Sequence, residues 1–120
     1  MKAQFRFQNL EVWKRAIAIA DQLFDVADDL ERRRLYRFAE QLRGAGMSMS
    51  NNIAEGSGSA SKKEFAHFVN IARRSTFENA NILIVLHKRN IITTDTLNQL
   101  LNELERLGRQ LTAFRRSLLA

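Results

Sequence analysis

The sequence contains no proline and no cysteine. Because a proline in a helix interior costs about 3 kcal/mol or more, its absence favours long, uninterrupted helices. The absence of cysteine excludes disulfide bonds, thiolate metal ligands and cysteine nucleophiles. Long apolar runs are also absent, since the longest, Ile82 to Leu86, is far shorter than the roughly 20 residues that span a bilayer. The N-terminus lacks the apolar core of a signal peptide, so we expect a soluble cytoplasmic protein with no membrane partner.

Four segments of the 120-residue chain have apolar residues at three- and four-residue steps, a period that is typical of helices. Three segments carry a terminal signal: Asn9 as an N-cap, Gly56 as a stop, and Ser61 to Glu64 as a capping box. The connections are short, and short connections between long helices make neighbours antiparallel. The sequence therefore predicts one all-α domain, an up-down-up-down four-helix bundle. Its helices are predicted at about residues 9–30, 34–55, 61–89 and 95–118.

Each predicted helix has one apolar stripe that we expect to face the core. In the first helix this stripe runs through Trp13, Ile17 and Ala20, and in the third it includes the polar Thr76 and Asn79. In the fourth helix the stripe is a row of mostly leucine side chains at alternating steps of three and four. Its members are Leu97, Leu100, Leu104, Leu107, Leu111, Phe114 and Leu118.

The third predicted helix is too apolar to leave one side in water. Beyond its core stripe it carries Ile71, Phe77, Ile84 and Val85. A helix that is apolar all round is buried all round, and each large aliphatic side chain left in water forgoes about 1.5–3 kcal/mol of burial. Ile82 belongs to this set as well, and the run from Ile82 to Leu86 is apolar around more than a full turn. Scattered surface hydrophobic residues are the alternative reading, but the residues of this run are adjacent. We therefore expect further copies of the chain to cover them in a homo-oligomer.

The segment SNNIAEGSGSASKKEF connects the second and third predicted helices. A tight hairpin turn explains its glycines, because Gly56 and Gly58 can supply positive φ angles. Glu55 can pair with Lys62 or accept hydrogen bonds within the turn. The two lysines are harder to explain by structure alone, since cations in a first helical turn oppose the helix dipole. An external phosphate bound at this helix N-terminus would explain Lys62 and Lys63.

The net charge of the chain is +6, and a basic excess favours polyanionic partners. Lys63, His67, Asn70 and Arg74 recur at steps of four, three and four, so they form one outward line about 16 Å long. Such a line can meet several phosphates with little sequence specificity. An ordinary solvated surface is the alternative reading. A second basic cluster, at the opposite end of this hairpin, consists of Arg32, Arg33, Arg34, Arg37, Lys88 and Arg89.

Three stretches of the chain carry a family resemblance. They are LEVWKRA near the start, EQLRGAGMSMSNNIAEGSGSASKKEFAHFVNIARRSTFENANIL in the middle, and the leucine-rich last segment. Together they cover nearly the whole chain, which resembles the four helix bundle proteins related to the 23S rRNA intervening-sequence protein. The resemblance implies an antiparallel four-helix bundle that assembles as a ring-like homopentamer with a basic surface.

The same resemblance suggests which residues matter for function. Related accessory proteins of diversity-generating retroelements bind a reverse transcriptase and nucleic acid. By this resemblance Asn52, Glu55 and Gly56 are framework or subunit-contact residues. The basic line and the resemblance together give the candidate nucleic-acid-binding residues, which are Arg43, Lys62, Lys63, His67, Arg73 and Arg74.

Enzymatic readings find little support in the sequence. Glu64 and His67 fit the Glu-x-x-His spacing of di-iron bundles, but such sites need a second pair and two further glutamates. The other histidine, His87, has Ile84 three residues before it. No nucleophile elbow or phosphate-binding loop spacing is present. We therefore predict a protein that is not an enzyme and has no metal and no cofactor.

Two functions remain open from the sequence. The first is a nucleic-acid-binding homo-oligomer, with RNA preferred to DNA, held mainly by phosphate contacts. The second is a protein–protein adaptor or scaffold whose basic ring docks an acidic partner or a polymerase, as a reverse-transcriptase accessory protein would. The two differ in salt-dependent binding to nucleic acid, which only the first predicts.

Overall fold

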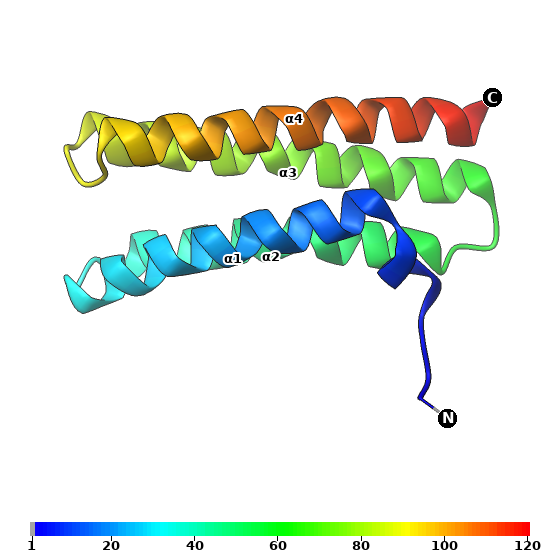
Figure 1. Cartoon of the computed structure of the whole chain (residues 1–120), viewed down its shortest axis with the longest axis horizontal. Coiled ribbons are helices and arrows are strands. Elements are labelled where there is room, and N and C mark those ends of the chain that lie inside the picture. The colour runs from blue at the N-terminus through cyan, green and yellow to red at the C-terminus, as the bar shows by residue number, and fades with distance from the viewer. Residues whose placement is uncertain (1) are drawn as a thin grey trace.

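The structure, a computed structural model, describes residues 2–120 and contains four long α-helices (Figure 1). The prediction of an all-α, four-helix fold is confirmed, and no described residue lies in a strand. None of the helices in residues 2–120 has an apolar stretch long enough to cross a bilayer. A short 3-10 helix, η1, precedes the four helices. The bounds are η1 Arg6–Asn9, α1 Glu11–Arg32, α2 Tyr36–Ser57, α3 Lys62–Lys88 and α4 Thr94–Leu119.

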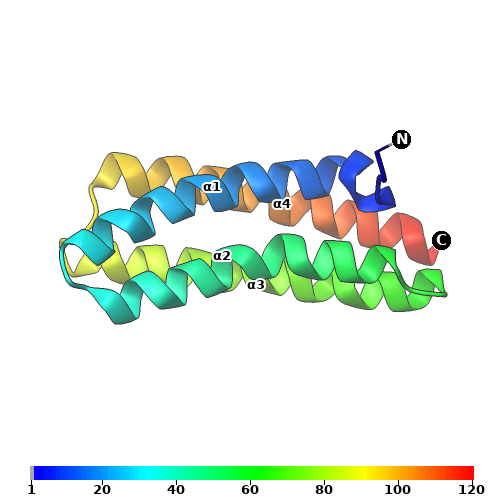
Figure 2. The same ribbon diagram turned by 90° about the horizontal axis from the view of Figure 1, so that it is seen from below.

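The four helices form two layers, with α1 and α2 in one and α3 and α4 in the other (Figures 1 and 2). The chain reverses at each turn, so α1 and α3 run away from the end that carries both termini and α2 and α4 run back. The α2–α3 turn therefore lies beside the termini. The α1–α2 and α3–α4 turns meet at the opposite end.

The hydrophobic core lies between the layers and takes one stripe from each helix. In α4 the predicted leucines from Leu97 to Leu111 are buried. In α1 the predicted stripe is partly wrong, because Ala16 and Ile19 are fully buried while Ile17 is 39% exposed. The sequence offers two overlapping stripes at helical spacing, and the bundle buries the one that brings the small Ala16 to the core.

The start of α1 also differs from the prediction that Asn9 is its N-cap. Asn9 is the last residue of η1, and Leu10 is the N-cap residue, without a side-chain cap. The amide of Leu10 donates to the carbonyl of Phe7 at 3.0 Å, so η1 leads directly into the helix. The predicted cap of α3 is present, since the Ser61 hydroxyl accepts from the amide of Glu64 at 3.1 Å.

The turns that follow α1 and α3 end their helices in the same way. Arg34 and Asn90 adopt left-handed φ angles of 65° and 61°. In each turn an amide beyond the helix donates back to a carbonyl of the last turn, the pattern of a Schellman motif. These bonds are Leu35 to Leu30 and Ile91 to Leu86, both at 2.8 Å.

The α2–α3 turn uses its glycines differently from the prediction. No glycine in residues 2–120 has a positive φ, so the expectation for Gly56 and Gly58 is wrong. Gly56 lies in the last turn of α2, where a Cβ atom would be 2.6 Å from Cβ of Phe68 and 2.9 Å from Cδ1 of Phe65. The glycine is needed for the close approach of α2 and α3 rather than for backbone freedom.

A buried polar seam joins α2 to α3. Asn79 is completely buried, as its place in the predicted core stripe requires, and its side-chain amide donates to the carbonyls of Ala45 and Ser75, both at 2.8 Å. The hydroxyls of Ser75 and Ser48 are 2.8 Å apart, and Asn52 donates to the carbonyl of Ser48 at 2.8 Å. These bonds between polar groups fix the register of the two helices, because slippage would leave the buried amide unpaired.

Candidate nucleic-acid interface

The predicted outward line on α3 is exposed along most of its length. Of its members, Lys63, His67 and Arg74 are exposed and Asn70 is half-buried. Lys62, a candidate residue beside this line in the first turn of α3, is exposed as well. We call the four exposed residues the basic ridge. The Ser61 cap fixes where α3 begins, which places both lysines in its first turn.

The charges of the basic ridge have no acidic partners within the described chain. Among residues 2–120, Lys62, Lys63 and Arg74 make no ion pair within 4.0 Å. The Glu55–Lys62 pair considered from the sequence is not formed, although both side chains are exposed. The ridge therefore presents uncompensated positive charge to solvent, which is what a phosphate contact requires.

Arg73 lies beside the basic ridge but faces α4. Its Nε donates to the hydroxyl of Thr112 at 2.8 Å, and its guanidinium lies 5.2 Å from the ring centroid of Phe77. The side chain is half-buried and has no carboxylate partner in residues 2–120. Arg73 thus keeps its charge but holds it over the groove between α3 and α4.

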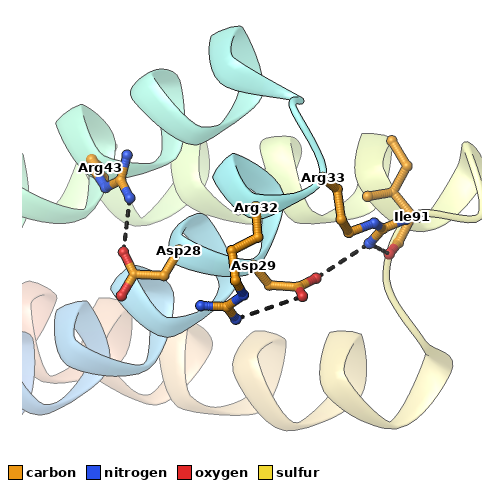
Figure 3. A network of polar contacts seen from close by, with 6 residues as sticks. All are labelled: Asp28, Asp29, Arg32, Arg33, Arg43 and Ile91. Atoms are coloured by element: carbon orange, nitrogen blue, oxygen red, sulfur yellow. Dashed lines mark hydrogen bonds and ion pairs between the residues drawn. The ribbon is translucent and has the colours of Figure 1, made fainter.

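Arg43, which the sequence suggested as a nucleic-acid contact, is already paired with acidic residues of its own chain. Its two terminal nitrogens bind Asp28 at 2.7 Å and Glu31 at 3.0 Å, so it links α2 to α1 (Figure 3 shows the bond to Asp28). The hydrogen bond with Asp28 is the main cause that raises the pKa of Arg43, and Glu31 adds to it. Because two carboxylates of its own chain compensate this charge, Arg43 is left out of the basic ridge.

A second polar network ties together the two turns at the far end of the molecule (Figure 3). Nη1 of Arg33 donates to the carbonyl of Ile91 at 2.9 Å and lies 3.3 Å from Asp29. Arg32 also pairs with Asp29, at 3.7 Å. The remaining cations of this end are exposed and make no ion pair with residues 2–120. They are Arg34, Arg37, Lys88 and Arg89.

The four predicted subunit-contact residues lie on two different flanks of α3. Phe77 and Ile84 are 62% and 37% exposed, and Phe77 lines a cavity of about 370 Å³ between α3 and α4. Val85, also 37% exposed, lines a separate cavity of about 510 Å³ between α2 and α3. Ile71 is half-buried, and the helical period puts it on the same flank as Val85. The basic ridge runs between these flanks.

Two exposed apolar residues of the other layer were not singled out from the sequence as surface residues. Ile17 of α1 is 39% exposed and Met47 of α2 is 40% exposed. Ile17 was expected in the core. Met47 was left unassigned, although it lies off the apolar stripe of α2, and this was the signal for its exposure.

The residues that fit a di-iron spacing do not form a metal centre in the described structure. Glu64 and His67 are both exposed on α3. Within residues 2–120 no group of three or more histidine, cysteine, aspartate or glutamate side chains is placed to hold a metal ion.

Comparisons with known proteins agree with this fold. Residues 8–113 match the model of a protein family described as 23S rRNA-intervening sequence protein. A solved crystal structure of a protein with unknown function from the S23 ribosomal protein family of Bacteroides thetaiotaomicron has a similar fold, with a TM-score of 0.82 at 20% sequence identity. The similarity covers 87% of this chain and 97% of that one. No curated protein matches the sequence.

Proposed function

We propose that this protein, which belongs to the family of 23S rRNA-intervening sequence proteins, is a non-enzymatic, self-associating nucleic-acid-binding protein of the cytoplasm. RNA, rather than DNA, is its proposed ligand, in keeping with the family description. The observation that carries the proposal is the basic ridge on α3. Its three full charges stand exposed on one helix without an ion-pair partner in residues 2–120.

The basic ridge suits recognition of the phosphate backbone rather than of bases. From Lys63 to Arg74 it is about 16 Å long, which matches several phosphates along one strand. Lysine and arginine at phosphates release counterions and fix orientation, but they carry little sequence information. We therefore propose that the protein binds nucleic acid tightly at low salt and with little dependence on sequence. Its overall affinity should rise with the number of basic ridges in the assembly.

Self-association would multiply these contacts. The exposed apolar residues on the two flanks of α3, Phe77 and Ile84 on one and Val85 on the other, support it, since exposed apolar surface of this kind marks interaction sites. We propose a ring-like homo-oligomer, with five copies as the count implied by the family resemblance. Five chains of 13.8 kDa would give a particle of about 69 kDa by light scattering.

The first experiment measures binding of the wild-type protein to RNA and to duplex DNA between about 50 and about 300 mM salt. We expect tight binding to RNA at the low end and a steep loss as salt rises. The triple variant Lys62→Gln, Lys63→Gln, Arg74→Gln should bind at least about tenfold more weakly at low salt, with an unchanged particle size. No binding of wild type to RNA at the lowest salt would contradict the proposal and leave the adaptor function.

A further inference from the structure

Three aromatic rings lead from the core to solvent at the end of the molecule that carries both termini. Trp13 of α1 packs against the core and contacts Phe7 of η1, with the two ring centroids 5.2 Å apart. Phe7 in turn stacks on Phe5, with the centroids 5.7 Å apart and 24° between the ring planes. Trp13 and Phe7 are half-buried, whereas Phe5 is 67% exposed. We call these three residues the aromatic ladder, and its outermost ring is open to solvent.

The backbone of η1 holds the aromatic ladder in place. The amide of Phe5 donates to the side-chain Oε1 of Gln8 at 2.7 Å, and the amide of Gln8 donates to the carbonyl of Phe5 at 3.1 Å. The short helix packs against both α1 and α2. A lid that only closed the end of the core would bury its outer ring, because an exposed apolar side chain forgoes the free energy of burial. Phe5 is instead fixed and exposed, which favours a ligand for its ring.

A cation lies between the two outer rings in the sequence. Arg6 is exposed and makes no ion pair within residues 2–120. Its guanidinium lies 5.2 Å from the ring centroid of Phe65, in the first turns of α3. This contact places Arg6 at the same end of the bundle as Lys62 and Lys63 of the basic ridge. Figures 1 and 2 likewise show η1 beside the α2–α3 turn.

This end of the molecule carries most of the positive charge. Residues 2–14, 52–66 and 110–120 together contain seven basic and three acidic residues, a net charge of +4. At the opposite end, residues 26–42 and 82–98 contain six basic and five acidic residues, a net charge of +1. An open aromatic ring and an excess of cations therefore occur together at the end that carries the termini.

We propose that an unpaired base of single-stranded RNA stacks on Phe5, while Arg6 contacts a flanking phosphate. Proteins that bind single strands combine aromatic rings for the bases with a cationic surface for the backbone. In a duplex the bases are already paired and stacked on one another, so they are not free to stack on Phe5. The inference rests on the RNA binding in the proposed function and deepens it by assigning a base-binding ring and a preference for single strands.

The test compares a short unstructured RNA with an RNA duplex that has the same number of phosphates. Phe5→Ala should bind the single strand at least about fivefold more weakly, the lower end of the loss on removing a stacking ring. Its affinity for the duplex should be that of wild type, and so should its dependence on salt, because no charge is removed. Since Phe5 is exposed, the variant should keep the thermal midpoint of wild type.

Two control variants distinguish stacking from a general loss of apolar surface. Phe5→Tyr keeps a ring at the site and should bind the single strand as wild type does. Tyr36→Ala removes a ring that is 56% exposed at the opposite end of the bundle, and it should also bind as wild type does. A Phe5→Ala variant with wild-type affinity for the single strand would overturn the inference. Equal losses for the single strand and the duplex would overturn it too, because paired bases cannot stack on the ring.

The role of Arg6 has its own measurement. Arg6→Gln should make the slope of log K against log salt shallower by about 0.7 for the single strand, the value for one phosphate contact. An unchanged slope would show that Arg6 does not contact a phosphate.

A second measurement detects the stacked base directly. The probe is a run of uridines with one 2-aminopurine, a base whose fluorescence falls when it stacks on an aromatic ring. With saturating protein, wild type should lower this fluorescence more than Phe5→Ala does, whatever the affinities of the two proteins. Equal fluorescence in the two complexes would contradict stacking on Phe5.

The triple variant of the basic ridge, Lys62→Gln, Lys63→Gln, Arg74→Gln, separates this inference from the proposed function. If the ridge variant binds RNA more weakly and Phe5→Ala does not, the aromatic ladder is not a binding site and the proposed function stands. If Phe5→Ala weakens single-strand binding and the ridge variant does not, the aromatic ladder stands and the basic ridge fails as the RNA contact. A wild type that binds no RNA at low salt would overturn both.

Discussion

The two helical hairpins, α1/α2 and α3/α4, have the same architecture but different chemistry. Both begin with a long helix that ends in a Schellman turn at the same end of the molecule. In the first hairpin the arginine between the helices, Arg43, is neutralised by Asp28 and Glu31. In the second, Arg73 has only a hydroxyl and an aromatic ring as partners, and the neighbouring cations of α3 are unpaired within residues 2–120. The charge of Arg43 is therefore compensated within the chain, whereas the charges of Arg73 and of the basic ridge are not.

The largest effect is expected where the two hairpins meet at Gly56. Gly56→Ala would bring a Cβ atom to 2.6 Å from Phe68 and force α2 and α3 apart. We expect the free energy of unfolding to fall by about 1–3 kcal/mol, the usual range for an overpacked core. Chemical denaturation followed by circular dichroism measures this change.

Gly58→Ala is the matched control for Gly56→Ala. Its Cβ atom would meet only the Glu55 carbonyl at an ordinary distance of 3.5 Å, and its φ of −85° suits any residue. We expect unchanged or slightly raised stability, by about 0.4–1 kcal/mol. Equal losses at both glycines would mean that the turn needs backbone freedom rather than a close helix approach.

The second largest effect on stability is expected in the polar seam between the hairpins. Asn79→Ala removes two buried hydrogen bonds and leaves the carbonyl of Ala45 facing a small cavity. We expect a loss of about 1–2 kcal/mol in the free energy of unfolding, as is typical for an unsatisfied buried group. Asn81→Ala, on the exposed side of the same helix, should change stability by less than about 0.5 kcal/mol. If the two variants were equally stable, the seam would not join the hairpins.

The smallest effect tests the contrast between Arg43 and Arg73. Arg43→Gln breaks two partly exposed ion pairs, so it should lower the free energy of unfolding only slightly, and less at high salt. RNA affinity should hardly change, because the charge of Arg43 is already compensated. A drop in RNA affinity as large as that of a ridge variant would show that Arg43 contacts the ligand and that the contrast is wrong.

Much of the fold could be predicted because it depends on local signals. The four helices follow from apolar residues at helical spacing, and the start of α3 follows from Ser61 and its bond to the Glu64 amide. The buried stripe of α1 could not be chosen, since Ile17 and Ile19 are equally apolar and only packing distinguishes them. Gly56 likewise indicates a turn from the sequence alone, whereas its actual role depends on two phenylalanines of the next helix.

The position of the candidate site could be predicted from the sequence, but the ion pairs of its residues could not. The helical period correctly placed Lys63, His67 and Arg74 on an exposed line. The pairing of Arg43 could not be inferred, because Asp28 and Glu31 approach it from another helix. The division of the α3 apolar residues into two flanks was, by contrast, present in the sequence. Phe77 and Ile84 share one side of the helical wheel, and Ile71 and Val85 share another.

The most direct test of the central claim is the slope of log K against log salt for RNA binding. The ridge variant Lys62→Gln, Lys63→Gln, Arg74→Gln is compared with a variant of equal charge from the other end of the bundle, Arg34→Gln, Arg37→Gln, Lys88→Gln. If the basic ridge contacts phosphates, the ridge variant has a slope shallower by about 2–3, and the control variant keeps the wild-type slope. Equal slopes for the two variants, or a ridge variant that binds like wild type, would contradict the account.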